Sequence, residues 1–149
     1  MRARALAYAW ASPATAIGLV VALLACVRGS LRVHAGVVEA DGPLLAWCLR
    51  SLVPIRGGAA AVTIGHVVIG RDGEALADTR AHERVHVGQY ERWGAFFFPA
   101  YLVASLWAAA RGQDFYLDNR FEREARAMEG GVTESTRRWS QSTRHGYGR

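Results

Sequence analysis

The sequence has no lysine, so its positive charge is carried by arginine alone. Its 18 arginines and 13 acidic residues give a formal net charge of +5 over 149 residues. The arginines are spread along the chain and no nucleic-acid-binding motif is present, so we expect no nucleic-acid partner. A basic balance of this kind is at most typical of a chain that lies close to an anionic membrane.

Cysteine is also scarce, which excludes two common ways of stabilising a small domain. The chain has Cys26 and Cys48, and neither lies in a CxxC pair. Two isolated cysteines do not make a disulfide framework, nor do they supply a cysteine-pair zinc site. We interpret both as small apolar residues.

The beginning of the chain lacks charge over an unusual length. Ala5 to Val27 is a run of 23 uncharged residues that follows Arg2 and Arg4. A helix of about 20 apolar residues can span a bilayer. No small-x-small cleavage site follows the run, so we predict an uncleaved transmembrane anchor over residues 1–30 rather than a signal peptide.

The remainder predicts an α+β domain over residues 31–130 and a disordered basic tail over residues 131–149. Turn residues and apolar patterns divide the domain into a small β-sheet and several helices. The expected strands are Leu31–Ala40 and Ala61–Ile69, and the expected helices are Leu44–Val53, Ala81–Trp93 (capped by Asp78 or Thr79), Pro99–Arg111 and Tyr116–Met128.

The strongest chemical signal is the HExxH pentapeptide His82-Glu83-Arg84-Val85-His86. Residues i and i+4 of a helix share one face, so the imidazoles of His82 and His86 can reach one metal ion. Glu83 is then placed to act as a general base on a metal-activated water. A polar helix face with two hydrogen-bonded histidines explains the same pattern without metal.

A hydrolytic zinc site needs a third protein ligand. In the HExxHxxGxxH arrangement that ligand is a histidine, but Arg92 stands at its position and excludes this arrangement. A glutamate on a later helix remains, and the stretch Asn119–Arg126 offers Glu122 and Glu124. Tyr90, Tyr101 and Tyr116 are candidates for stabilising an oxyanion, and the sequence does not choose among them.

These motifs resemble those of the gluzincin class of zinc metallopeptidases, whose membrane-linked members carry a third ligand in an ExxAD pattern. Glu122–Arg126 matches ExxA and departs at Arg126, which removes a carboxylate that could orient a histidine. The stretches Glu83–Gly94 and Tyr116–Ala125 are also similar to a group of small bacterial membrane-linked HExxH proteins. The resemblance covers roughly residues 60–128.

The resemblance implies a minimal zincin-like core that binds Zn²⁺ through His82, His86 and Glu122, with Glu124 as the alternative ligand. It further implies a metallopeptidase that acts on a peptide or protein substrate at the bacterial inner membrane, with Glu83 as the catalytic base. The competing interpretation is a membrane-associated structural or interaction protein without catalysis, which retains zinc or lacks it.

A second apolar run, Trp93 to Ala110, restricts the possible topologies. If it crossed the bilayer, His86 and Glu122 would lie on opposite sides. The residues 111–121 that follow are too polar and too short to return across a hydrocarbon core of about 30 Å. We therefore expect one spanning helix near the N-terminus and a second apolar helix that is buried or half-inserted.

Overall fold

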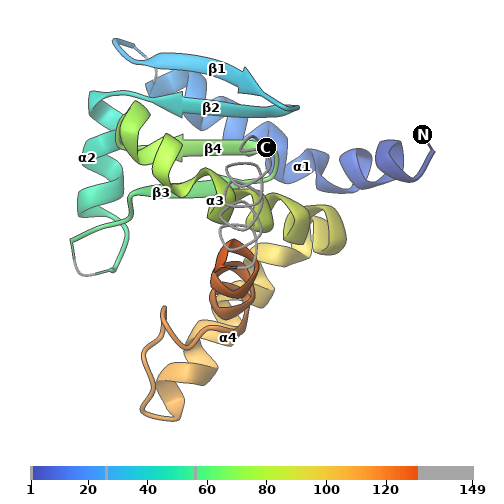
Figure 1. Cartoon of the computed structure of the whole chain (residues 1–149), viewed down its shortest axis with the longest axis vertical. Helices are drawn as coiled ribbons and strands as arrows, with labels where there is room; N and C mark the ends of the chain where they lie inside the picture. The colour runs from blue at the N-terminus through green and yellow to red at the C-terminus, as the bar shows by residue number, and fades with distance from the viewer. Residues whose placement is uncertain (1, 26, 56, 131–149) are drawn as a thin grey trace, which may run out of the picture.

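The computed structural model describes residues 2–25, 27–55 and 57–130 (Figure 1). Cys26 and the predicted disordered tail over residues 131–149 lie outside the described residues, and the domain boundaries at residues 30 and 130 stay predictions. The predicted α+β class is confirmed. The labelled elements are α1 (Arg2–Ala25), β1 (Ser30–His34), β2 (Val37–Asp41), α2 (Pro43–Ser51), β3 (Ala61–Ile64), β4 (Val67–Gly70), α3 (Gly73–Trp93), η1 (Gly94–Phe96) and α4 (Phe97–Ala110), and residues 120–130 form a further helix.

Each predicted strand is in fact a β-hairpin, so the sheet has four strands in the order β1-β2-β4-β3. The first hairpin turns at Ala35 and Gly36, which both have positive φ (46° and 80°). The second turns at Gly65 (φ 64°) and His66, where a Cβ on Gly65 would lie 2.4 Å from the backbone nitrogen of Thr15. Two-residue turns with positive φ join antiparallel strands, and the β-branched composition of both stretches concealed them.

Helix α3 begins at Gly73, eight residues before the predicted start at Ala81. Its N-cap is Asp72, whose side chain accepts a hydrogen bond from the Ala75 amide at 2.8 Å. The predicted caps Asp78 and Thr79 lie inside the helix, so the HExxH pentapeptide occupies the middle of α3 rather than its first turns.

The last described helix starts at residue 120 rather than at Tyr116. Asn119 precedes it, and its side-chain oxygen accepts a hydrogen bond from the Phe121 amide at 2.9 Å. Its amide nitrogen donates to Ser105 of α4 at 2.8 Å. Asn119 therefore begins this helix and fixes it to the middle of α4.

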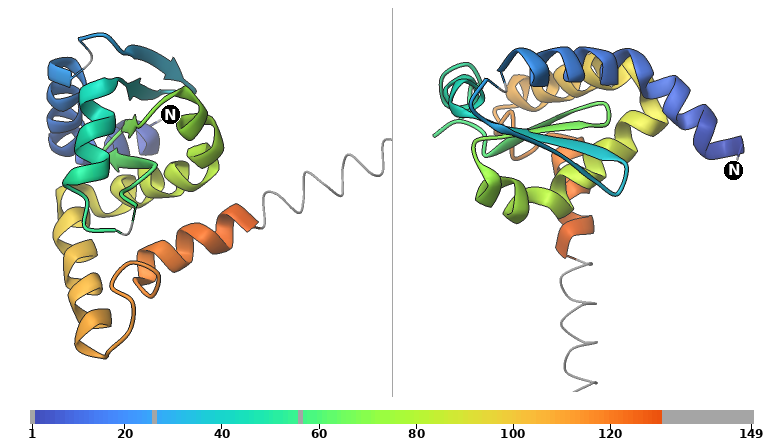
Figure 2. Two further views of the ribbon diagram at one scale, coloured as in Figure 1. Left: turned by 90° about the vertical axis from the view of Figure 1, so that its left-hand side faces the viewer. Right: turned by 90° about the horizontal axis from the view of Figure 1, so that it is seen from above.

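The sheet lies between two helical layers (Figure 2). Its two faces follow the alternation of side chains along a strand. Ala40, Val67 and Ile69 pack with residues of α1 and α2, whereas Val37 and Val68 pack with residues of α3. The parallel pair β2 and β4 forms the middle of the sheet, and β3 is left at one edge.

Helix α1 packs against the sheet and against the other helices through small residues, and it leaves most of its large apolar residues outside. Ala11, Ala14, Gly18 and Ala22 are buried at helical spacing. A Cβ on Gly18 would lie 2.6 Å from the carbonyl oxygen of Ile64, so only glycine permits this approach. The outer side chains are exposed, among them Leu6, Trp10, Ile17, Val20 and Leu23.

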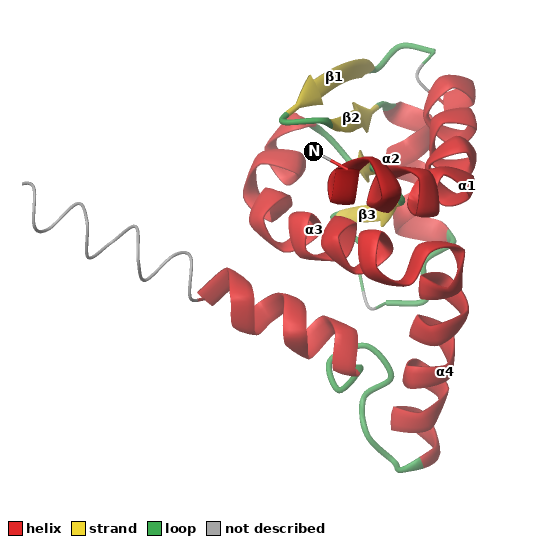
Figure 3. Cartoon of the chain, turned by 90° about the vertical axis from the view of Figure 1, so that its right-hand side faces the viewer, coloured by secondary structure: helices red, strands yellow, loops and turns green. Residues whose placement is uncertain are grey.

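Two helical stretches are long and apolar enough to cross a membrane by length and composition: Leu6–Leu23, and a window within Gly73–Ala110. The first belongs to α1, and the apolar part of the second belongs to α4. Figure 3 shows α1 and α4 along the same side of the molecule, with α4 extending beyond the sheet. The predicted N-terminal apolar helix is therefore present, and it packs on the sheet at Gly18.

Candidate metal centre

The two histidines of the HExxH pentapeptide meet Glu122 at the contact between α3 and the helix over residues 120–130. The Nε2 atoms of His82 and His86 are 3.2 Å apart. His82 Nε2 lies 3.2 Å from Glu122 Oε2, and His86 Nε2 lies 3.2 Å from Glu122 Oε1. Within the described part of the chain, this is the only group of three or more potential ligands placed to hold a metal ion.

Glu122 has the environment expected of a ligand rather than of a surface acid. It is 2% exposed, and its Oε1 accepts a hydrogen bond from the Tyr101 hydroxyl at 2.7 Å. Its Oε2 is the one buried side-chain polar atom of the described residues that lacks a well-aligned hydrogen bond. Burial alone would raise the pKa of Glu122, but the two imidazoles beside it hold that pKa well below its usual range.

Gln89 orients His86, and no sequence motif had pointed to it. His86 Nδ1 lies 2.8 Å from the Gln89 side-chain oxygen, which can only accept a hydrogen bond. Nδ1 therefore carries a proton, and Nε2 is the ring nitrogen that faces the cluster. The Gln89 amide nitrogen donates to the Phe121 carbonyl at 3.1 Å, so Gln89 also holds the helix that carries Glu122. The only available signal was its i+3 spacing from His86.

His82 is held by a similar, looser contact on its second nitrogen. Its Nδ1 lies 3.4 Å from Glu129 Oε2, two turns beyond Glu122 on the same helix. A carboxylate at the distal nitrogen of a histidine is a common arrangement behind metal-binding histidines. Glu122 raises the pKa of His82, and burial opposes that shift.

Glu83 lies on the sheet side of α3, beside the cluster but outside it. It is 5% exposed, and its Oε2 accepts a hydrogen bond from Thr63 Oγ1 at 2.6 Å. Burial raises the pKa of Glu83, while the neighbouring His86 opposes the shift. Thr63 belongs to the edge strand β3, so Glu83 connects the cluster to the free edge of the sheet.

The alternative ligand Glu124 faces away from the imidazoles. Its Oε2 accepts from Gln89 at 2.9 Å, and its Oε1 accepts from Arg92 at 3.0 Å. Arg126, at the position where the ExxAD pattern fails, lies 3.9 Å from Glu122 Oε2. The structure thus brings Glu122, rather than Glu124, to the two histidines.

The three candidate tyrosines have different surroundings. Tyr101 contacts Glu122 directly. Burial, and then the nearby Glu122 carboxylate, raise the pKa of Tyr116, which places its hydroxyl close to the cluster. Tyr90 instead packs against Phe97, with ring centroids 4.5 Å apart, in the apolar core.

The remaining described histidines lie apart from the cluster. His66 was expected to be a strand residue, but it occupies the turn between β3 and β4. It is 4% exposed, stacks on Tyr8 with ring centroids 4.1 Å apart, and contacts Thr15 and Glu91. It therefore joins α1 to α3. His34 ends β1, and His145 lies outside the described residues.

In comparisons with known proteins, no family model, no curated protein and no solved structure matches the chain. The resemblance to gluzincins therefore rests on the HExxH and Glu-x-x-Ala motifs alone.

Proposed function

We propose that this chain is a small membrane-associated zinc metallopeptidase. The observation that carries the proposal is the set of three mutual contacts of 3.2 Å among His82, His86 and the carboxylate of Glu122. Two nitrogens and one carboxylate are also the ligand set found in many hydrolytic zinc sites.

The spacing of these atoms suits zinc. Ligands at about 2.0 Å from a tetrahedral ion lie roughly 3.3 Å from one another. The unsatisfied oxygen of Glu122 and the Nε2 atom of His86 both face this space. A metal ion would supply the missing partner for each of them.

Bound zinc would lower the pKa of a water and polarise a substrate carbonyl. Glu83 would take up a proton at its carboxylate and deliver it to the leaving amine. Thr63 fixes Glu83 Oε2, which leaves Oε1 as the oxygen that moves the proton. Tyr101 and Tyr116 lie close enough to Glu122 to donate to a developing oxyanion.

The substrate class that we propose is an extended peptide. Among the described residues strand β3 pairs only with β4, so we propose that its other edge pairs with a further strand. Thr63 of β3 holds Glu83, so a peptide paired along this edge would pass beside the proposed base.

We propose a location at the bacterial inner membrane, with α1 lying along the membrane rather than across it. The 14 residues of α4 rise only about 21 Å, which is short of a hydrocarbon core of about 30 Å. Helix α1 is long enough to span, but the sheet packs along its middle at Gly18. A spanning α1 would place open sheet edges in hydrocarbon, where their backbone groups have no partners.

The test compares Glu83→Gln with Glu74→Gln, an exposed glutamate in the first turn of the same helix. We expect Glu83→Gln to keep its zinc and to lose hydrolysis of a quenched fluorescent peptide library by more than about 100-fold, because general-base catalysis contributes on this scale. Glu74→Gln is expected to match the natural chain. Equal hydrolysis by both variants would remove Glu83 as the base.

The second candidate is a zinc-retaining protein without catalysis, and the burial of the site favours it. The side chains of His82 and His86 are only 13% and 9% exposed, which leaves little access for a substrate. This function predicts that the natural chain binds zinc stoichiometrically and hydrolyses no peptide in the library.

A further inference from the structure

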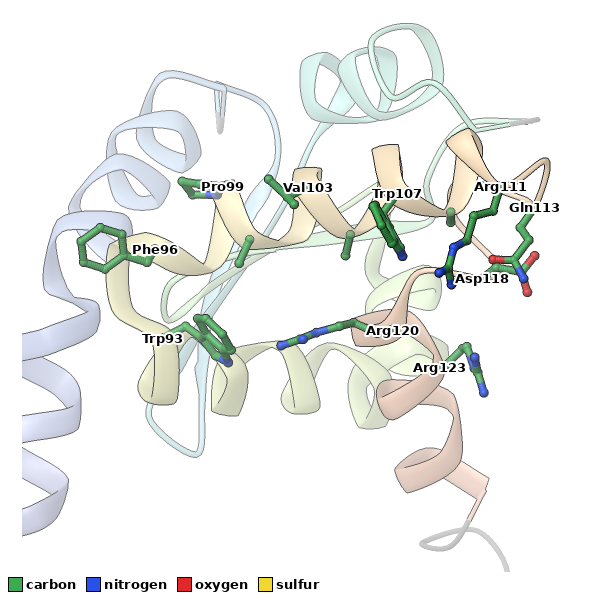
Figure 4. A pocket seen from close by; sticks show the side chains of 13 residues that line it. Trp93, Phe96, Pro99, Val103, Trp107, Arg111, Gln113, Asp118, Arg120 and Arg123 are labelled. Atoms are coloured by element: carbon green, nitrogen blue, oxygen red, sulfur yellow. The ribbon is translucent and has the colours of Figure 1, made fainter.

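A groove of about 700 Å³ lies between α4, the end of α3 and the start of the helix over residues 120–130, away from the histidines (Figure 4). One part of its wall is apolar and includes Trp93, Phe96 and Val103. At the other end it is lined by Arg111 and Arg123, with Trp107 next to Arg111, whereas the guanidinium of Arg120 reaches across to Trp93 (Figure 4). The groove thus has an apolar end and a cationic end.

The cationic end has little internal compensation. None of the three arginines forms a salt bridge with a described residue. Arg111 lies over the ring of Trp107 at 4.6 Å, and Arg120 lies over the ring of Trp93 at 5.4 Å. Asp118 is the only acidic residue of the lining, and its carboxylate accepts a hydrogen bond from the Asp114 amide at 2.9 Å. The lining therefore carries an excess of positive charge.

The apolar end continues into the exposed surface of α4. Phe98, Leu102 and Leu106 are 58%, 45% and 70% exposed. Helix α4 itself runs along the side of the molecule on which α1 lies (Figure 3). A ligand in the groove can therefore extend its apolar part toward the same surroundings that cover α4.

We infer that the groove binds an anionic phospholipid, with an acyl chain along α4 and the phosphate at Arg111 and Arg123. One guanidinium group can donate two parallel hydrogen bonds to two oxygens of a phosphate, whereas the ammonium group of a lysine cannot. Tryptophan side chains prefer the level of the headgroups, where Trp107 would lie. The site does not involve the histidines, so its occupancy is independent of bound metal.

The test uses the purified full chain in a mild nonionic detergent and isothermal titration calorimetry. The probes are dihexanoyl phosphatidylglycerol, dihexanoyl phosphatidylcholine with the same chains, and inorganic phosphate. We expect the anionic lipid to bind roughly tenfold more tightly than the zwitterionic lipid, because arginines near an anionic headgroup contribute on this scale. Phosphate alone is expected to show no saturable binding, since it lacks the acyl chain.

The variant Arg111→Gln/Arg123→Gln leaves Arg120 and its ring contacts in place. We expect it to reduce the affinity for phosphatidylglycerol to that for phosphatidylcholine. The matched control Arg32→Gln/Arg50→Gln removes the same charge from exposed positions on β1 and α2 and is expected to change neither affinity. Equal loss in both double variants would overturn the inference.

Two measurements on the natural chain need no substitution. Raising the ionic strength is expected to weaken the binding of phosphatidylglycerol and to spare that of phosphatidylcholine, because salt screens exposed charges. Equal affinities for the two lipids, or phosphate bound as tightly as phosphatidylglycerol, would contradict a lipid site.

Discussion

Two regions of this molecule reverse the usual distribution of polar and apolar side chains. At the candidate metal centre, Glu122 is 2% exposed, whereas on α4 the side chain of Leu106 is 70% exposed. Burying a carboxylate and exposing a large apolar face both cost free energy. Each region is therefore explained best by a partner outside the chain.

The two regions differ in how narrowly the protein restricts the partner that can bind there. At the candidate metal centre, Tyr101 donates a hydrogen bond to Glu122, and Gln89 accepts one from His86, so both ligand side chains are held in place. On α4, the side chains of Phe98, Leu102 and Leu106 are left exposed by the described residues. We infer that the first region selects a small ion and that the second selects only an apolar phase, with the arginine groove adding charge preference.

The largest expected effect separates the two acidic ligand candidates. Glu122→Gln is expected to weaken zinc binding by more than about 100-fold, because changes behind the ligands already cost 10- to 100-fold. Glu124→Gln, a matched change two residues away, removes only contacts to Gln89 and Arg92 and is expected to cost less than about tenfold. Competition with a chromogenic zinc chelator measures both. A larger loss in Glu124→Gln would move the third ligand.

A smaller effect is expected from the residue that orients His86. Gln89→Leu keeps the volume but removes the acceptor for His86 Nδ1 and the donor to the Phe121 carbonyl. We expect zinc affinity to fall by about 10- to 100-fold, the range found for residues behind metal ligands. Gln89→Glu restores an acceptor at the same place and is expected to recover part of the loss. Zinc affinity unchanged in Gln89→Leu would show that Gln89 has no positioning role.

Substitutions in the apolar region of α4 are expected to weaken membrane binding rather than zinc binding. Leu102→Ser/Leu106→Ser is expected to lower partitioning into phosphatidylcholine vesicles by about tenfold or more, since burying one leucine contributes roughly 1.5–3 kcal/mol. Zinc content is expected to stay unchanged. The control Leu31→Ser/Val33→Ser alters exposed apolar residues on β1, away from α4. If the control loses as much partitioning as the α4 variant, the membrane surface has been assigned to the wrong side.

The smallest expected effect concerns Glu39, a second buried glutamate whose surroundings differ from those of Glu122. It is buried, but Arg80 donates to both of its oxygens at 2.8 and 2.9 Å, so it needs no external ion. These hydrogen bonds from Arg80 lower the pKa of Glu39. The stability that ionised Glu39 contributes to the fold is therefore fully present above the unfolded pKa of about 4.3. It is lost as the pH falls through the lower pKa of Glu39 in the folded protein.

We therefore expect Glu39→Gln to destabilise the fold by about 1.5–3 kcal/mol at neutral pH, the range for a hydrogen bond to a charged group. The difference from the natural chain is expected to shrink as the pH falls below about 4.3 and through the lower folded pKa of Glu39. Thermal unfolding at several pH values measures it, and zinc content serves as the control. A difference that grows as the pH falls would contradict the assignment of charge to Glu39.

Local patterns predicted the elements better than their ends. The i, i+4 histidines required a helix, and the motif resemblance chose Glu122 over Glu124. The two hairpins were missed because each stretch has valine or isoleucine on both sides of its glycine, Gly36 or Gly65, and a single glycine did not mark a turn. The start of α3 was missed because Asp72, Asp78 and Thr79 are all acceptable caps, and only tertiary packing selects among them.

The role of Gln89 could not be predicted for a different reason. Its contacts to His86 lie within one helix, but its donor reaches the Phe121 carbonyl 32 residues later. Long-range contacts of this kind depend on how the helices cross. The packing of α1 on the sheet could not be predicted for the same reason, because a run of apolar residues does not show which face of the helix contacts the rest of the protein.

The zinc content of the purified natural chain tests the central claim most directly, with His82→Ala/His86→Ala as the comparison. Both proteins are expressed with zinc, purified without chelator and measured by inductively coupled plasma mass spectrometry. We expect about one zinc ion per natural chain and less than about a tenth per variant chain, because the variant retains one of the three ligands. A folded natural chain with less than about a tenth of a zinc ion would contradict the metal centre.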